Sequence, residues 1–261
     1  MCRLYLVSTL FLLLLGVAAA CQTVPITGRS QLMLLPEFEE MRMGLQAYQE
    51  ILSKSKVSHD PGLNDLVTRV GTRIARATGR LDYRWEFTVI EDSKQVNAFA
   101  LPGGKVAVYT GILPVTRDEA GLATVMGHEV AHATARHGGE RVSQGLLVQV
   151  GLAATQAAMA TRDPRTVQQV TGLLGAGAAV GVILPFSRAQ ESEADHLGLI
   201  YMAKAGYDPR AAVSFWQRME QAAQGRRSPP EFLSTHPSHG ARIRQIEQWI
   251  PEAMQYYQGS R

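Results

Sequence analysis

The chain has 261 residues, of which 46% are hydrophobic and 19% are charged, and its formal net charge is +3. This composition is globular and allows one sizeable core, and the small charge without a dense lysine and arginine stripe excludes a nucleic-acid binder held by phosphate neutralisation. The two cysteines, Cys2 and Cys21, both lie in the N-terminal leader, which excludes a disulfide framework and a cysteine-based metal site.

The leader has the three-part layout of a secretory signal peptide at 1–20, with Arg3 before an apolar run and small residues before Cys21. The apolar run is short for a membrane span, although an uncleaved anchor is the alternative. The stretch AAAC resembles a bacterial lipobox, whose cysteine is lipidated after cleavage, but Ala18 stands where leucine is more usual. The resemblance implies that acyl chains hold Cys21 at a membrane surface. Gln22, rather than aspartate, after the cysteine implies the periplasmic side of the outer membrane, that is, its inner leaflet.

Two helices are expected before the middle of the chain. A tether at 21–36 comes first, and residues 37–57 then have helical spacing. Asp60 and Pro61 have the residue types of a helix N-cap and a first helical position. The apolar stripe of one helical face follows them, which predicts a second helix. Its residues are Leu63, Leu66, Val67, Val70 and Ile74.

Strands are expected only in the middle of the chain. The alternation of Trp85, Phe87 and Val89 with polar neighbours predicts a half-buried strand. The stretch VNAFALPGGKVAVYTG predicts two further strands joined at the turn 102–104. Everything after Thr116 has the pattern of helices, so the fold class is α+β and mostly α.

Residues 144–186 contain two apolar, small-residue-rich stretches separated by TRDPRT. Each stretch is shorter than the roughly 20 residues that a helical membrane span needs. A soluble helical hairpin is therefore the favoured interpretation, and membrane-dipping segments are the alternative.

The stretch MGHEVAHATARHGGE carries His128 and His132 four residues apart, with Glu129 directly after the first. A capping box, TRDE at 116–119, predicts the start of a buried helix. Residues i and i+4 lie only about 40° apart on a helix, so both imidazoles can reach one ion, while Glu129 is about 100° away and can touch a metal-bound water. A solvated polar face is the alternative, and the apolar neighbours disfavour it. On the same helix His137 would lie about 180° from the site, as a structural or surface histidine.

A third metal ligand is expected in SRAQESEADHLGL, which predicts a helix capped by Ser187. Glu191 and Asp195 lie on one face of this helix, where two carboxylates repel each other unless a cation compensates them. Glu193 lies about 200° from Glu191 and is expected to face solvent. The spacing leaves open which of Glu191 and Asp195 binds the metal and which accepts a hydrogen bond from a ligand histidine.

HEVAH followed by ESEAD resembles the M48 family of zinc metallopeptidases, whose shared pattern is HExxH and then ExxxD. Further matches are ITGRSQL near the start, NAFALPGG, PFSR before the second motif, and STHPS near the end. The resemblance covers about residues 22–250 and is nearest to the periplasmic lipoprotein branch of the family. It implies a zincin-like fold with a small β-sheet and an active-site helix, a peptidase domain at 37–250 and a C-terminal tail at 251–261.

The resemblance also implies the roles of the motif residues. One Zn²⁺ per chain is bound by His128, His132 and Glu191, and Asp195 accepts a hydrogen bond from a ligand histidine. Glu129 is then the general base, and a metal-activated water attacks the peptide bond.

The negative oxygen that forms on the carbonyl needs a hydrogen-bond donor. His236 is the candidate, with Arg242 behind it, and the resemblance points the same way. In some relatives such a histidine instead caps the zinc and switches the enzyme off. A plain loop histidine beside Pro237 is the third interpretation.

Substrates of proteases usually lie along an exposed strand edge. Backbone groups of one strand are therefore expected to pair with an extended peptide, and a plain core strand is the alternative. The residues are Asn97, Ala98, Phe99 and Ala100.

Two functions follow from these features. The first is a zinc metalloendopeptidase of the bacterial cell envelope that hydrolyses misfolded or misassembled proteins. The second is a chaperone-like periplasmic binding lipoprotein for outer-membrane clients, with a largely closed zinc site. The intact Glu129 favours the peptidase. The expected partners are unfolded polypeptides and, through Cys21, the membrane.

Overall fold

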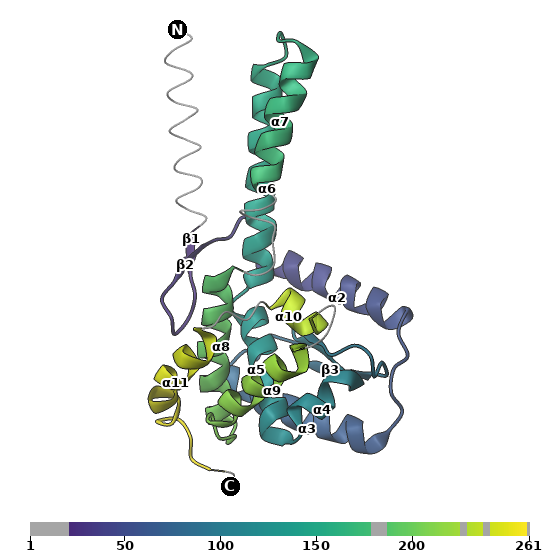
Figure 1. Cartoon of the computed structure of the whole chain (residues 1–261), viewed down its shortest axis with the longest axis vertical. Coiled ribbons are helices and arrows are strands. Elements are labelled where there is room, and N and C mark those ends of the chain that lie inside the picture. The colour runs from purple at the N-terminus through teal and green to yellow at the C-terminus, as the bar shows by residue number, and fades with distance from the viewer. Residues whose placement is uncertain (1–20, 179–186, 225–228, 237–240, 260–261) are drawn as a thin grey trace. The chain divides into compact units, whose positions relative to one another are not determined.

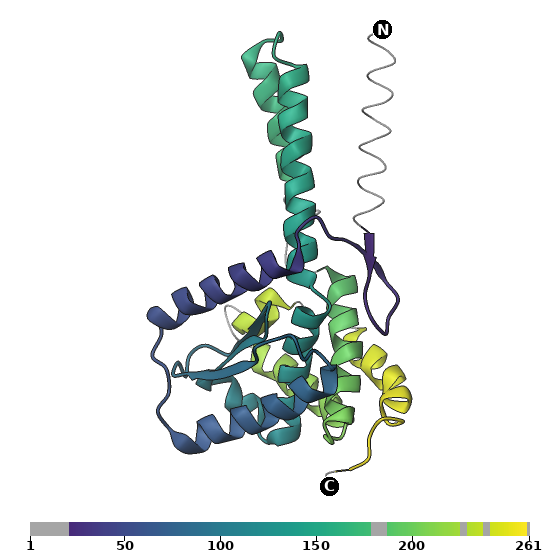
Figure 2. The same cartoon turned by 180° about the vertical axis from the view of Figure 1, so that it is seen from behind.

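The structure is a computed structural model that describes residues 21–178, 187–224, 229–236 and 241–259 (Figure 1 and Figure 2). The signal peptide expected at 1–20 lies outside the described residues. The described chain is mostly helical with two small sheets, which confirms the expected α+β class. It divides into two units: the hairpin unit, Met1–Glu37 with Gly138–Leu184, and the main unit, Phe38–His137 with Pro185–Arg261.

The main unit follows the expected order of helices, sheet and helices. Its elements are α2 (Glu37–Ser53), α3 (Pro61–Thr78), β3 (Glu86–Ile90), β4 (Ala98–Leu101), β5 (Lys105–Tyr109), the 3₁₀ turn η1 (Thr110–Ile112), α4 (Leu113–Thr116), α5 (Glu119–Thr134), α8 (Arg188–Lys204), α9 (Ala211–Ala223), α10 (Glu231–Thr235) and α11 (Arg242–Ala253).

Helix α3 begins as the sequence predicts. The Asp60 carboxylate accepts the backbone N–H of Gly62 at 2.8 Å, and Pro61 is the first helical residue. An N-cap of this kind stabilises a helix by about 1 kcal/mol, because it satisfies a backbone donor that has no partner inside the helix. The predicted apolar stripe is buried at Val67, Val70 and Ile74.

The three expected strands form one sheet in the order β3-β5-β4. Strands β4 and β5 are antiparallel and joined by the expected turn at 102–104, where Gly103 and Gly104 have φ of 84° and 86°. Other residues adopt this backbone region only with strain, so the glycines make the tight turn possible. The parallel pairing of β3 with β5 was not predicted. Strand β4 contacts α5, so the sheet lies against the helix with the two histidines.

The expected capping box at the start of α5 is wrong. The N-cap is Asp118, whose carboxylate accepts the N–H of Gly121 at 2.8 Å. Thr116 is instead the last residue of α4, and its hydroxyl donates to the carbonyl of Leu113. The left-handed backbone of Arg117, with φ of 67°, separates the two helices and excludes Thr116 from α5. Residues 121–134 of α5 are all buried.

Helices α5 and α8 cross at a pair of glycines. A Cβ atom on Gly127 would lie 3.0 Å from the carbonyl oxygen of Gly198, and one on Gly198 would lie 3.0 Å from the backbone of Gly127. Larger residues at this crossing would push the helices apart. The close approach brings the HEVAH motif of α5 next to the ESEAD motif of α8. Ser187 and Gln190 form a capping box at the start of α8, where Ser187 was predicted.

The hairpin unit contains β1 (Cys21–Thr23), β2 (Ser30–Leu32), most of α6 (His137–Ala158) and α7 (Pro164–Ala178). Strands β1 and β2 are antiparallel, so the segment expected as a tether forms a small β-hairpin. The expected helical pair at 144–186 is present up to Ala178, with α6 and α7 side by side in both views (Figure 1 and Figure 2). Among the described residues, the structure contains no helix with the length and apolar character of a membrane span.

Candidate metal centre

The expected metal ligands, the expected base and the residues expected to assist them converge in the core of the main unit. All of them are buried. They are His128, Glu129 and His132 on α5, Glu191 and Asp195 on α8, His236 directly after α10, and Arg242 at the start of α11.

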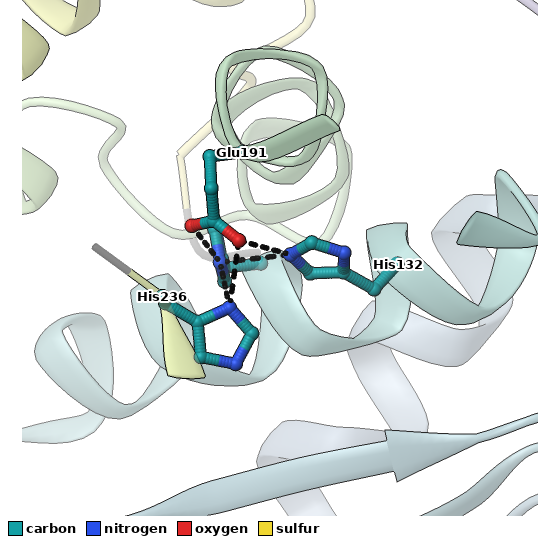
Figure 3. Close-up of side chains that lie close together, drawn as sticks. His132, Glu191 and His236 are labelled. Carbon is teal, nitrogen blue, oxygen red and sulfur yellow. Dashed lines mark hydrogen bonds and ion pairs between the residues drawn. The ribbon is translucent and has the colours of Figure 1, made fainter. Parts of the chain in front are cut away.

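Four of these side chains can each offer one donor atom to a common point. Their donor atoms lie within 4.8 Å of one another, and the residues are His128, His132, Glu191 and His236. The Nε2 atoms of His128 and His132 are 3.1 Å apart, and His128 Nε2 is 3.2 Å from His236 Nδ1. Figure 3 shows His132, Glu191 and His236 pointing toward one another from three different parts of the chain.

The spacing of these donors fits one zinc ion. Ligands at 2.0–2.1 Å from a tetrahedral zinc lie about 3.3 Å from one another. Glu191 lies 3.0 Å from His236 Nδ1, 3.3 Å from His132 Nε2 and 3.4 Å from His128 Nε2. Glu191 Oε2 is buried and makes no well-aligned hydrogen bond within the described part of the chain, with Arg242 Nη2 3.2 Å away. Imidazoles and a buried carboxylate are the donor set that zinc binds.

The carboxylate of Glu191 is held in its charged form. Burial acts to raise its pKa, but hydrogen bonds with His128, His132 and His236 outweigh burial and lower the pKa far below its usual value. A charged carboxylate is the form that binds a cation.

Asp195 lies outside the donor set and contacts His128. Its Oδ1 atom is 2.9 Å from His128 Nδ1, so the ring nitrogen that faces away from the donor cluster has a carboxylate partner. Arg242 donates to the same carboxylate from Nη2 at 2.8 Å, with Nε 2.7 Å from Oδ2. Burial acts to raise the pKa of Asp195, but the charge of Arg242 and the His128 contact lower it overall. The two carboxylates that the spacing left equivalent therefore have different surroundings.

Arg242 was expected behind His236, and it does contact the carbonyl of that residue through Nη1 at 3.4 Å. Its main contacts are elsewhere. Nη2 lies 3.2 Å from Glu191 Oε2, and the guanidinium stacks 3.4 Å from the ring centre of Trp216. Arg242 is 1% exposed, so it neutralises the two α8 carboxylates inside the core.

Glu129 faces the centre without joining the donor set. Its Oε1 atom lies 3.3 Å from His236 Nε2. Burial raises the pKa of Glu129 to about 7, because desolvation disfavours the charged form. The backbone of Ala100 on β4 also hydrogen-bonds this side chain. A carboxylate with a pKa near neutrality can both take up and release a proton.

His236 is 3% exposed and is not a plain surface-loop histidine. Its Nδ1 atom belongs to the donor set, and its Nε2 atom faces Glu129. The same ring thus reaches the metal position and the expected general base. The sequence left two other roles open for His236, a donor to the negative oxygen and a cap on the metal. With Nδ1 in the donor set, the ring has the position that capping the metal requires.

His137 and Glu193 do not lie where the sequence predicted, which was away from the site for His137 and facing solvent for Glu193. His137 is completely buried, with Nδ1 2.8 Å from His132 Nδ1 and Nε2 2.9 Å from Glu193 Oε2. Glu193 is 6% exposed rather than solvent-facing. Helix α5 ends at Thr134, and Arg136 has φ of 59°, so the angle expected for His137 on a continuing helix does not apply. No glycine or proline lies between His132 and His137, so these residues carry no signal of the break.

The strand expected to bind substrate, β4, is an edge strand of its sheet, and no described strand pairs with its outer edge. Asn97 accepts the N–H of Tyr109 on the inner side at 3.1 Å. Because antiparallel pairing alternates along a strand, Asn97 and Phe99 turn their backbone groups toward β5, and Ala98 and Ala100 turn theirs outward. Of the expected set, only Ala98 and Ala100 therefore face a peptide with their backbone groups, and the N–H of Ala98 already donates to Asn97 Oδ1 at 3.0 Å.

Cys21, the expected lipidation site, is exposed at the start of β1 in the hairpin unit.

Comparison with known proteins gives one consistent result. The model of peptidase family M48 matches residues 61–250. The chain is 40% identical over 235 residues to the mitochondrial metalloendopeptidase OMA1 of Schizosaccharomyces pombe, covering 88% of this chain and 66% of that protein. It is 33% identical over 251 residues to the human OMA1 metalloendopeptidase, covering 88% and 46%. It is 29% identical over 238 residues to the beta-barrel assembly-enhancing protease of Escherichia coli, covering 87% and 47%. The matched region thus spans about half to two thirds of these relatives.

Proposed function

Because the chain belongs to peptidase family M48, a family of zinc metallopeptidases, we propose that it is a zinc-dependent endopeptidase that hydrolyses polypeptides. The observation that carries the proposal is the buried set of donor atoms with the spacing of a tetrahedral zinc site, next to a glutamate that is not itself a donor. In this proposal His128, His132 and Glu191 hold the zinc, and Asp195 orients His128.

Zinc held in this way supplies a Lewis acid that polarises the scissile carbonyl and makes an attacking water more acidic. Glu129 takes a proton from the attacking water and then gives it to the departing amine. Its pKa of about 7 suits both steps. The oxygen that becomes negative needs a donor, and His236 with Arg242 remains the proposed one when the His236 ring turns away from the donor cluster.

The outer edge of β4 is the proposed binding site for the substrate backbone. It lies beside the catalytic carboxylate, because the Ala100 backbone hydrogen-bonds Glu129. A peptide added there as a further strand would place its scissile bond next to the metal and Glu129.

A series of peptide substrates tests this binding site. Methylation of one backbone nitrogen at a time is expected to raise KM at every second residue, since only alternate N–H groups of an added strand face the protein. Loss of one such hydrogen bond costs about 1 kcal/mol, or roughly a fivefold rise in KM. The intervening methylated peptides are the control. Equal effects at neighbouring positions would contradict strand addition.

A chaperone-like binding protein with a largely closed zinc site is the second candidate. It is favoured by one observation, the place of His236 Nδ1 in the donor set, where it occupies the position that a reacting water would need. The two functions can belong to one chain if the His236 ring moves.

The setting we propose is the bacterial cell envelope, with misfolded or misassembled proteins as substrates. It is supported by the signal-peptide layout of 1–20, by Cys21, and by the similarity to a bacterial protease named for beta-barrel assembly. The corresponding organisation is a lipidated segment at 21–36, a peptidase domain at 37–250 and a tail at 251–261. Anchoring at the inner leaflet of the outer membrane rests on Cys21 and Gln22.

Metal removal tests the function directly. The purified protein is expected to contain one zinc per chain and to digest casein or another unfolded protein. A chelator should abolish digestion, and added zinc should restore it, because the three ligands stay in place around the vacated position. Zinc content and digestion are measured on the same samples. Full digestion by zinc-free protein, or a protein that binds no stoichiometric zinc, would contradict the proposal.

A further inference from the structure

His137 and Glu193 form a buried pair that the reaction described above does not use. We propose that they are positioning residues, which hold the His132 ring in the tautomer whose Nε2 lone pair faces the metal. This inference rests on the proposed zinc site. It concerns how one ligand is oriented rather than which residues bind the metal.

The pair forms a single chain of contacts leading to the metal position. Glu193 Oε2 lies 2.9 Å from His137 Nε2, and His137 Nδ1 lies 2.8 Å from His132 Nδ1. His132 Nε2 then faces the donor cluster, 3.3 Å from Glu191 Oε1 (Figure 3). All the side chains in this series of contacts are buried, and His137 is completely buried. Water therefore does not compete for these hydrogen bonds.

The direction of the hydrogen bonds follows from the chemistry of each group. A carboxylate oxygen accepts, so the proton of a neutral His137 ring is on Nε2 and its Nδ1 atom is an acceptor. His132 must then donate from Nδ1. A neutral imidazole has only one N–H, so His132 Nε2 is left with the lone pair that a metal requires.

The two histidines of α5 are thus oriented by different hydrogen-bond partners. His128 Nδ1 contacts the carboxylate of Asp195 directly, whereas His132 reaches the carboxylate of Glu193 through a second imidazole. Partners of this kind fix the ring and the tautomer of a metal-bound histidine and make it a better ligand. Helix α8 supplies both terminal carboxylates as well as Glu191, so the orientation of both rings depends on the crossing of α5 with α8.

Four variants separate this role from a purely structural one. His137→Phe keeps a ring but removes the acceptor for His132. Glu193→Met keeps a side chain of similar length but removes the carboxylate that accepts from His137. His137→Asn keeps an acceptor near the Nδ1 position, and Glu193→Gln keeps a carbonyl oxygen for His137. The first two variants interrupt the series of hydrogen bonds from Glu193 to His132, and the last two preserve it in part.

The readout is the zinc dissociation constant of folded, metal-free protein, measured by competition with a coloured chelator. The two interrupting variants are expected to bind zinc about 10- to 100-fold more weakly than wild type, and the two preserving variants should lie closer to wild type. Combining His137→Phe with Glu193→Met should weaken binding no further than His137→Phe alone, because both break the same chain. Glu252→Gln is the control, since it alters a second His–Glu contact, with His196, outside the donor cluster.

Wild-type zinc affinity in the interrupting variants, or the same loss in preserving and interrupting variants, would overturn the inference. If His137→Phe does not fold, the comparison of Glu193→Met with Glu193→Gln decides by the same criterion. A wild-type protein without stoichiometric zinc would instead refute the proposed function.

Discussion

Replacing Glu129 by glutamine is expected to lower kcat by about 10²- to 10⁴-fold, the usual contribution of a general base, while the protein keeps its zinc. Glutamine has the shape of glutamate but cannot take a proton from water. Glu129 is not one of the donor atoms around the metal position, so the ligand set is unchanged. The free energy of unfolding should not fall, because the change removes a buried group whose charged form burial already disfavours.

Two further variants locate the effect. Glu191→Gln should lose both zinc and activity, since it alters a donor atom. Glu50→Gln, on the exposed side of α2, should leave both unchanged. Steady-state cleavage of an unfolded protein and zinc content are measured for all three. Normal turnover in Glu129→Gln, or loss of its zinc, would remove Glu129 from the role of base.

The fold and the core of the site could be predicted from local patterns. A spacing of four residues places His128 and His132 on one helical face whatever the rest of the chain does. The cap at Asp60 and the turn at 102–104 likewise depend on neighbouring residues alone, and both are present in the structure.

The choice between Glu191 and Asp195 could not be made from spacing, because both lie on one face of α8. It depends on where α8 crosses α5, and this is determined by the close contact of Gly127 with Gly198. The family resemblance distinguished the two carboxylates in the sequence. In the structure the distinction is made by distance, with Glu191 among the donors and Asp195 paired with Arg242.

The errors at Thr116 and His137 share one cause, an unrecognised change of backbone direction, whereas Glu193 was misplaced because α8 is buried on more than one face. Arg117 and Arg136 both have positive φ, a conformation that an arginine seldom adopts and that its sequence neighbours do not announce. The first separates Thr116 from α5. The second ends the helix before His137, so that this side chain turns back to His132. Extrapolating a helical angle across such a residue gives the wrong face.

Replacing Arg242 by methionine is expected to lower the free energy of unfolding of the metal-free protein by about 3–5 kcal/mol, the cost of removing one partner from a buried ion pair. Arg242 lies 2.7 Å from Asp195 and 3.2 Å from Glu191, and all three side chains are buried. Methionine would leave two carboxylates in the core without this cation. Urea unfolding measures the change.

Two comparisons separate charge from packing in this prediction. Asp195→Asn, added to Arg242→Met, removes one uncompensated charge but keeps an acceptor for His128, so part of the lost stability should return. Arg42→Met, which removes an exposed ion pair of α2, should cost less than about 1 kcal/mol. If Arg242→Met also lowered the free energy of unfolding by less than about 1 kcal/mol, the carboxylates of α8 would be compensated without Arg242. In that case the protein would tolerate two like charges at the crossing of α5 with α8 even without a metal, and the electrostatic reason for a cation there would fail.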